Sequence, residues 1–364
     1  MNSLSEYKSP LIIDLGTENI KVGISGQKEE LLIFKNIIGL LKDNTSLIGT
    51  DYINNTKIDF PKTRNIVQNG IFLNINDIGS LFSYIYKKLS IPENEITEHP
   101  ILISEPILNL KKNRENIANI LFDNLNIPAI SFASQPVLSI FSTSFTDGII
   151  LDSGEGISQS CIIQNGIPIK NTYVRCDYGG GDITNYLKEI FKNSGYSFVN
   201  AQDMLLLKKI KEQICFVCSD GNFPIPSEFK LPDNSIIRIG DEKVLATELL
   251  FNPSLNHLKY LSFQEMIINS VNGFDIQLRR NIFQNIILFG GNTKFKGIQK
   301  RISKEIKKIA PNHTKIKILT FPKIDNPVIK GGIFISSLNS FKDMWIMKNE
   351  FLDKGYNIIH EKAI

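Results

Sequence analysis

Ile149-Ile150-Leu151-Asp152-Ser153-Gly154-Glu155-Gly156-Ile157-Ser158 is the stretch that decides the fold. Its apolar run predicts a buried strand, and the aspartate at the end of that strand is followed at once by a turn of small residues. Glycines let backbone N–H groups converge at positive φ, and a carboxylate beside such a turn suits a metal-bound polyphosphate. The stretch is therefore a candidate phosphate site.

The same pattern occurs much earlier in the chain, at Leu11-Ile12-Ile13-Asp14-Leu15-Gly16-Thr17-Glu18-Asn19-Ile20. Strand, aspartate, glycine turn and second strand follow in the same order. Either turn alone fits a plain hairpin better than a phosphate site. The repetition changes this balance, because two such hairpins facing each other would clamp a phosphate chain between two half-molecules.

Composition predicts an ordinary soluble globular protein with two or more cores, since 42% of the 364 residues are hydrophobic and 21% are charged. The net charge is only +4. We interpret the lysines at Lys208-Lys209 and from Lys304 to Lys308 as solvated faces, because no aromatic residues are interleaved as strand-stacking sites require. No direct nucleic-acid contact is expected. No run approaches the ~18 uncharged apolar residues of a membrane span.

Four cysteines lie in largely apolar surroundings: Cys161, Cys176, Cys215 and Cys218. No signal peptide precedes them, which favours a reducing, intracellular compartment. Cys215-x-x-Cys218 has zinc or redox spacing, but the chain has no second pair and its four histidines are scattered. We expect helix cysteines in a core.

Strand and helix patterns alternate in both halves of the chain. Apolar periodicity predicts helices over residues 76–89, 113–126 and 297–309, and short apolar runs predict buried strands at 101–103 and 286–289. Each half therefore reads as a hairpin followed by alternating strands and helices. Two α/β lobes are expected.

Short motifs along nearly the whole chain resemble those of the actin family. They occur in the family's order: Ser104-Glu105, Gln135 to Leu138, Leu151 to Gly156, Gly195 to Val199, Lys211-Glu212, Leu231-Pro232-Asp233, Gly290-Gly291, Gly331-Gly332 and Met344-Trp345-Ile346. The resemblance implies a two-lobed actin-like ATPase fold, with duplicated cores and a nucleotide cleft between the lobes. Lobe one would comprise residues 1–135, completed by 328–364, and lobe two residues 136–327.

The resemblance also implies ATP with a divalent cation. Asp14 and Asp152 would hold Mg²⁺ through its waters, because this small cation keeps much of its hydration shell. Lys211 and Glu212 match positions that hold adenine and ribose, although an isolated Lys-Glu pair would be a helix surface. Contacts to the cofactor are implied for Gly16, Thr17, Lys21, Ser153, Gly154, Glu155, Gly156, Lys211, Glu212, Gly290 and Gly291.

The catalytic positions implied by the resemblance are Gln135, Asp152 and Gln159. Gln135 matches the residue that orients the attacking water, which matters because phosphoryl transfer depends on positioning and charge stabilisation. Glu155 replaces the family's aspartate, and Gln159 stands where the family has a histidine. We therefore expect a weak ATPase at most, and Glu18 and Asp325 are further departures near phosphate and adenine.

The implied function is that of an actin-like cytoskeletal protein whose assembly is regulated by ATP, in the cytoplasm, with the nucleus as an alternative. Its partners would be other actin-like subunits or actin-binding proteins. The alternative is a non-polymerising actin-related subunit with structural ATP, favoured by Asn69 in place of a modified histidine and by the short loop from Lys42 to Ser46. The first turn also resembles that of sugar kinases and of seventy-kilodalton heat-shock chaperones, but the actin-like match leaves no room for a peptide-binding domain.

Overall fold

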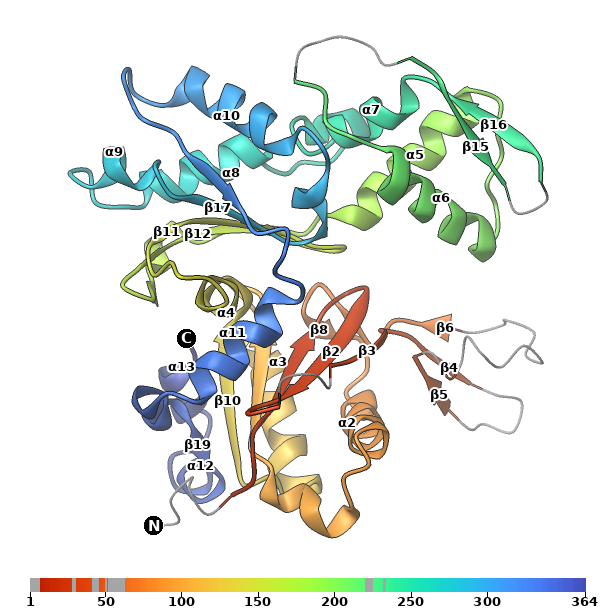
Figure 1. The fold of residues 1–364 in the computed structure, drawn as a ribbon. Helices are drawn as coiled ribbons and strands as arrows, with labels where there is room; N and C mark the ends of the chain where they lie inside the picture. Colours follow the sequence, from red (N-terminus) through yellow and green to blue (C-terminus); the bar gives the residue numbers. More distant parts are fainter. Residues whose placement is uncertain are drawn as a thin grey trace. The chain divides into compact units, whose positions relative to one another are not determined.

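The computed structural model of the chain (Figure 1) describes residues 7–27, 31–40, 46–49, 51, 63–219, 225–231 and 234–364. The loop residues Lys42 to Thr45 and the pair Pro232-Asp233, both used in the sequence analysis, lie outside these ranges. The chain forms two compact units, described separately below. Unit 1 comprises Met1–Thr146, Asn165–Pro168 and Ile324–Ile364, and unit 2 comprises Asp147–Gln164 and Ile169–Lys323.

Unit 1 is built on a mixed sheet with the strand order β19-β10-β9-β1-β2-β3. β1 and β2 form an antiparallel hairpin, whereas β9 runs parallel to both β1 and β10. The strands are β1 (Leu11–Leu15), β2 (Asn19–Ile24), β3 (Leu32–Lys35), β9 (Ile101–Glu105), β10 (Ala129–Ser134) and β19 (Ile346–Met347).

Helices cover both faces of this sheet. Period-two alternation places Leu11 and Ile13 of β1 in one core cluster, and Ile12 in a second cluster with Ile329 of α11. In Figure 1, α2 and α11 accordingly lie on opposite sides of the sheet. The α-helices of unit 1 are α2 (Asn76–Lys88), α3 (Lys111–Asn119), α4 (Gln135–Phe141), α11 (Pro327–Ser336), α12 (Lys348–Lys354) and α13 (Asn357–Lys362).

Small ribbons and turns complete unit 1. β4 pairs with both β5 and β6, and β7 pairs with β8. These elements are β4 (Ile38–Leu40), β5 (Ser46–Ile48), β6 (Thr63–Arg64), β7 (Val67–Gln68), β8 (Ile71–Phe72) and β13 (Ile167–Pro168), with 3-10 turns η2 (Glu93–Glu98) and η7 (Asn339–Met344) and a π-turn η3 (Ile120–Asn124).

Unit 2 has its own sheet, in which β12, β11, β17 and β18 are neighbours and β14 pairs with β12. The strands are β11 (Gly148–Ser153), β12 (Ser158–Gln164), β14 (Val174–Cys176), β17 (Ile286–Phe289) and β18 (Ile318–Thr320), with a separate ribbon of β15 (Ser227–Lys230) and β16 (Ile236–Ile239). The helices are α5 (Gly180–Asn193), α6 (Ala201–Ile214), α7 (Glu242–Glu248), α8 (Phe263–Asn272), α9 (Arg279–Ile282) and α10 (Ile298–Ile309), with 3-10 turns η4 (Lys170–Thr172), η5 (Pro253–Asn256) and η6 (Gly291–Lys294).

The two sheets repeat one topology. In unit 1 the hairpin β1–β2 is extended by antiparallel β3 on one side and by parallel β9 and β10 on the other. In unit 2 the hairpin β11–β12 is extended by antiparallel β14 and by parallel β17 and β18 in the same way. The duplicated core expected from the two aspartate hairpins is present.

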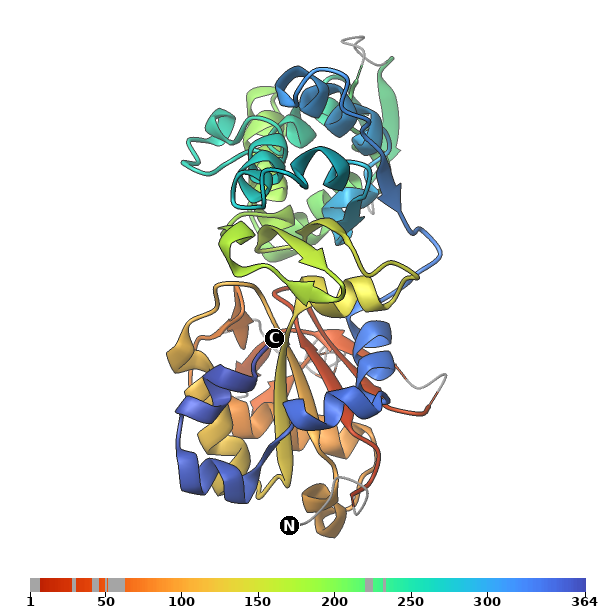
Figure 2. The same cartoon turned by 90° about the vertical axis from the view of Figure 1, so that its left-hand side faces the viewer.

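The limits of the units differ from the limits expected at residues 135/136 and 327/328. Unit 1 keeps α4 and runs on to Thr146, and it also takes in Asn165–Pro168. The physical reason is close packing of α4 on α11, because a Cβ added at Gly331 would lie 1.6 Å from the carbonyl oxygen of Leu138. The blue C-terminal segment accordingly runs beside the sheet of unit 1 in both views (Figures 1 and 2).

Most of the expected elements are present with shifted ends. The strand expected at residues 101–103 is β9, and the helix expected over 297–309 is α10. The segment expected as one helix over 113–126 is α3 followed by the π-turn η3, with Ile117 and Leu121 buried as predicted. Within the described residues, no helix is both long and apolar enough to cross a membrane.

Candidate functional site

In unit 1, three donors hold the carboxylate of Asp14, which is 3% exposed. Ser104 Oγ donates to Asp14 Oδ1 over 2.7 Å, and Gln135 Nε2 donates to the same oxygen over 3.1 Å. Lys21 lies directly opposite Asp14 in the β1–β2 hairpin, and its Nζ is 3.2 Å from Asp14 Oδ2. The structure thus brings together the metal, phosphate and water-orienting candidates of this half of the chain.

The turn after β1 is fixed by backbone geometry. A Cβ added at Gly16 would lie 2.6 Å from the carbonyl oxygen of Asn19, so this position requires glycine. The amide of Asn36 donates to the carbonyl oxygen of Thr17 over 2.8 Å, and the backbone N–H of Asn69 donates to Thr17 Oγ1 over 3.1 Å. The Thr17 hydroxyl accepts that bond, which leaves its own proton available for donation. Glu18 pairs with Lys35, which neutralises the carboxylate beside this turn.

In unit 2, Asp152 and Gln159 occupy the positions that Asp14 and Lys21 occupy in unit 1. The two residues are directly opposed in the β11–β12 hairpin, and Gln159 Nε2 donates to Asp152 Oδ2 over 2.9 Å. Gln159 is 1% exposed. The amide fixes the carboxylate, as a cation does in unit 1, but it supplies no charge.

The hydroxyl of Ser153, a candidate contact to the phosphates, forms hydrogen bonds within the protein. Ser158 Oγ donates to the carbonyl oxygen of Tyr178 over 3.0 Å, so the 2.7 Å contact between Ser153 Oγ and Ser158 Oγ uses the Ser153 proton. Asn292 Nδ2 donates to Ser153 Oγ over 2.9 Å. This chain of hydrogen bonds consumes the Ser153 donor and fixes the end of β11.

The glycine turn after β11 is tied to the start of helix α5. The backbone N–H of Gly154 donates to the carbonyl of Ile157 over 2.9 Å, which closes the turn around Gly156. The N–H groups of Gly180 and Gly181, at the start of α5, donate over 2.9 Å each to the carbonyls of Gly154 and Glu155. The first amides of α5 therefore hold this turn in place.

Glu155 faces two lysines of helix α6. Its Oε1 lies 3.0 Å from Lys208 Nζ, and its Oε2 lies 3.5 Å from Lys211 Nζ. Lys211 is 3% exposed and also donates to the carbonyl oxygen of Gly180 over 2.7 Å. Burial lowers the pKa of Lys211, although the charge of Glu155 opposes that effect. Lys211 is therefore no helix-surface lysine, whereas its neighbour Glu212 is exposed.

The Gly290-Gly291 pair joins β17 to η6, and the two glycines have different roles. Gly290 adopts φ 88° and ψ 166°, a region that essentially only glycine visits, and a Cβ there would lie 2.2 Å from the carbonyl oxygen of Ser153. Gly291 is exposed, and a Cβ added to it would meet nothing within 4 Å. Gly290 therefore serves packing against β11, and Gly291 leaves a bare surface beside it.

The residues present fit a magnesium-bound polyphosphate. Mg²⁺ needs only one or two carboxylates when it keeps its waters, and no group of three His, Cys, Asp or Glu suited to a metal occurs within the described ranges. Asp14 and Asp152 supply one carboxylate in each unit, and Lys21 supplies a positive charge for a phosphate. The turn after β1 has close backbone packing at Gly16, whereas a Cβ added at Gly154 would lie 3.9 Å from the nearest atom, the carbonyl oxygen of Ile157.

Sequence reasoning assigned no role to several residues that complete the site. Asn292 directly follows the glycine pair, and this position was a usable signal. Ser104 lies near the end of a buried strand, as Asp14 does, which was a second usable signal. The run Gly179 to Gly181 precedes an amphipathic segment. Glycines at this place indicate the start of a helix that packs closely against another stretch of backbone. Lys208, interpreted from the sequence as part of a solvated face, is instead half-buried and pairs with Glu155.

Three of the four cysteines are core residues, but none lies in a helix as expected: Cys161 and Cys176 are in β12 and β14, and Cys215 follows the end of α6. Cys161, Cys176 and Cys215 are buried, Cys218 is half-buried, and none of the four forms a disulfide. Burial raises the pKa of Cys215 to about 12 and also raises that of Cys161. These two thiols stay protonated at neutral pH, which argues against a redox role.

A comparison with known protein families completes the description of the site. The sequence model of the family described as Actin matches residues 5–364, and that range includes both aspartate hairpins and the Gly290-Gly291 turn. The α/β architecture, with its two related sheets, agrees with the fold of that family. The chain belongs to the actin family.

Proposed function

We propose that the protein binds ATP with Mg²⁺ through the two aspartate hairpins. The observation that carries the proposal is their equivalence: Asp14 and Asp152 sit at matching places on β1 and β11, each fixed by the residue opposite it and followed by a glycine turn. A single such hairpin is weak evidence. Two on duplicated sheets, in a chain of the actin family, favour one nucleotide held by both.

Each of the proposed site residues would make a particular contact with the bound Mg-ATP. Bound Mg²⁺ would offset the phosphate charge, with Asp14 and Asp152 accepting hydrogen bonds from its waters. Lys21 would contact a phosphate oxygen, and the hydroxyl of Thr17 would donate to another. Lys211 and Glu212, with Gly291, would hold the nucleoside.

Hydrolysis is proposed to be slow. Gln135 would orient the attacking water, and its amide already lies 3.1 Å from Asp14 Oδ1. Gln159 cannot take up a proton as an imidazole can, and Glu155 is engaged by Lys208 and Lys211. The site therefore holds water by hydrogen bonds and offers little general-base assistance.

The nucleotide carried by the purified protein tests the proposal. Heat-released ligand, separated by ion-exchange chromatography, is expected to contain ATP or ADP in about one equivalent. A fluorescent ATP analogue should bind only with a divalent cation and be displaced by ATP. Protein that carries no nucleotide and fails to bind the analogue would contradict the proposal.

The bound nucleotide could serve either assembly or stability of the fold. We propose actin-like, nucleotide-regulated assembly in the cytoplasm, with actin-like subunits or actin-binding proteins as partners. Phe141, Leu338 and Met344, which match the family's apolar groove, stay partly exposed, whereas Ile335 is 2% exposed and belongs to the core. One end of the molecule would thus keep an apolar surface for a neighbour.

One observation favours the second candidate, a non-polymerising subunit with structural ATP. β4 ends at Leu40 and β5 begins at Ser46, and these two residues are paired, so only five residues connect the strands. A head-to-tail filament requires two complementary surfaces on every copy, and a connection of this length contains few residues for such a surface. Sedimentation with and without Mg-ATP separates the candidates: pelleting with filaments in the electron microscope supports assembly, and a persistent monomer supports the subunit.

A further inference from the structure

Positive charge is concentrated in one short segment of unit 2. From Lys294 to Lys317 the chain has nine Lys or Arg residues and one acidic residue, Glu305, which gives a net charge of +8. The whole chain has a net charge of only +4, so the remaining residues are net negative by four. The segment includes all of helix α10 and the residues that lead into β18. A general basic character of the protein does not explain this local excess.

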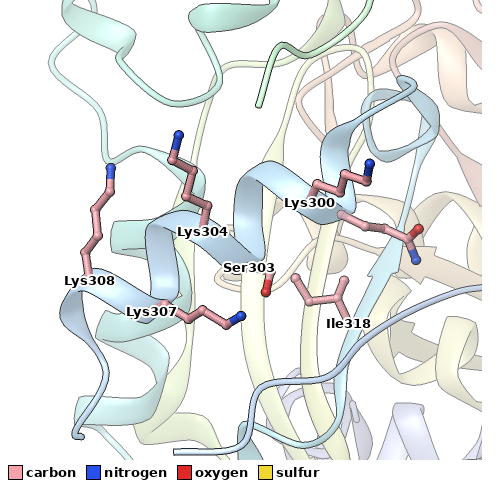
Figure 3. Close-up of a pocket in the computed structure, with 7 residues that line it drawn as sticks. Lys300, Ser303, Lys304, Lys307, Lys308 and Ile318 are labelled. Carbon is pink, nitrogen blue, oxygen red and sulfur yellow. The ribbon is translucent and has the colours of Figure 1, made fainter. Parts of the chain in front are cut away.

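Helix α10 divides its faces between the core and a hollow. Ile298, Ile302 and Ile306 are buried in the core of unit 2. The opposite face contributes to an open hollow of about 610 Å³, shown in Figure 3. Its lining residues are Gln299, Lys300, Ser303, Lys304, Lys307 and Lys308 of α10 together with Ile318 of β18.

Among the described residues, most of the lysines at this hollow have no acidic partner. Lys308 pairs with Glu305, whose carboxylate also pairs with Arg301 over 2.8 Å. Lys304 donates to the carbonyl oxygen of Ser219 over 2.8 Å, which leaves its charge uncompensated. Within the described part of the chain, no carboxylate forms an ion pair with Lys300, Lys304 or Lys307.

The side chains differ in direction around the hollow. In Figure 3, Lys300, Lys304 and Lys308 extend from one side of α10, as expected for an i, i+4, i+8 row. Lys307 extends on the other side, beside Ser303 and Ile318. The lysine ammonium groups therefore lie on both sides of a surface that contains the Ser303 hydroxyl and the Ile318 side chain.

We propose that this hollow binds a compact polyphosphorylated ligand, such as a cyclic polyol with several phosphates. Lysine binds phosphate as a point charge, and Ser303 and Gln299 add neutral donors. The volume falls within the roughly 300–1,000 Å³ usual for small-molecule sites, and Ile318 supplies an apolar contact for a ring. No aromatic residue lines the hollow, which disfavours a single-stranded nucleic acid. None of the lining residues belongs to the proposed ATP site.

Calorimetry of the full chain with inositol hexakisphosphate tests this site. Excess Mg-ATP is present throughout, so that the proposed nucleotide site cannot supply the signal. The triple variant Lys300→Gln, Lys304→Gln, Lys307→Gln is expected to lose affinity about tenfold or more. The matched control is Lys209→Gln, Lys230→Gln, Lys259→Gln, which removes the same charge from exposed positions elsewhere in unit 2 and should stay within about twofold of wild type.

A phosphorylated polyol can occur as a free soluble molecule or as the headgroup of a membrane lipid. Vesicles containing phosphatidylinositol bisphosphate that pellet with the protein, and release it on adding inositol hexakisphosphate, support the site with a membrane source. Calorimetric binding without vesicle pelleting supports it with a soluble source. Absence of binding to either probe, equal losses in both triple variants, or equally tight binding of oligothymidylate or polyglutamate would overturn the proposal.

Discussion

The side chains of Asp152 and Gln159 face each other across the β11–β12 hairpin, with Gln159 Nε2 2.9 Å from Asp152 Oδ2. In unit 1 the equivalent pair is Asp14 and Lys21, whose closest atoms are 3.2 Å apart. The duplicated sheet thus carries the same aspartate twice, with a cation opposite one copy and a neutral amide opposite the other. In the proposed ATP site, this difference would give charge neutralisation to unit 1 and positioning to unit 2.

Gln159→His is expected to raise the rate of ATP hydrolysis by about tenfold, because an imidazole can accept a proton from water and an amide cannot. ATP affinity should change by less than about threefold, since either side chain can donate to Asp152. Single-turnover phosphate release measures the rate. An unchanged rate in the variant would remove Gln159 from the account of slow hydrolysis.

Gly290→Ala is expected to destabilise the protein by about 2–4 kcal/mol, because φ 88° with ψ 166° excludes a side chain and the new Cβ would meet the Ser153 carbonyl. Gly291→Ala is the matched control. Its Cβ meets nothing within 4 Å, so the free energy of unfolding should change by less than about 1 kcal/mol. Urea denaturation gives both values, and equal losses would contradict the division of roles between the two glycines.

Gly291→Ala should still weaken ATP binding, since this glycine contacts the nucleoside in the proposed site. A loss of about threefold to tenfold is expected, by calorimetry, from a methyl group placed on that surface. Wild-type affinity in this variant would show that the nucleoside lies elsewhere.

Asn292→Ala should cost about 1–3 kcal/mol of stability, because the carbonyl of Gly154 and the hydroxyl of Ser153 lose a buried donor. Asn193→Ala, at the exposed end of α5, should stay within about 0.5 kcal/mol of wild type. Both are measured by denaturant unfolding. A neutral Asn292→Ala would mean that the hydrogen-bonded chain from Asn292 to Tyr178 does not fix the turn.

Lys211 gives a pH dependence with a defined sign. Burial lowers its pKa below the ordinary 10.5, so between the lowered value and 10.5 the unfolded chain binds more protons than the folded chain. The free energy of unfolding contributed by this group therefore rises with pH in that window. Lys211→Gln should reduce the slope, while Lys209→Gln on the exposed side of the same helix should not. Identical slopes in urea titrations of wild type and both variants would contradict the buried-lysine assignment.

The sequence predicts the hairpins, the strand β9 and the helix α10 because these signals are local: apolar periodicity and an aspartate before a glycine turn. The family resemblance implies a nucleotide contact for Lys211, but not its burial or its pairing with Glu155. The use of Ser153 could not be predicted in this way, because its partner Asn292 lies 139 residues further along the chain. The same applies to the end of unit 1, which depends on the packing of Gly331 against Leu138. Tertiary contacts decide these features.

Calorimetric titration of Mg-ATP into wild type, Asp14→Asn, Asp152→Asn and the exposed control Asp275→Asn tests the central claim most directly. Each of the two site variants should lose about tenfold or more of Mg-ATP affinity and most of the dependence on Mg²⁺, while far-ultraviolet circular dichroism stays that of wild type. The control should bind as wild type does. Unchanged Mg-ATP affinity in either folded site variant would contradict a nucleotide held by both aspartate hairpins.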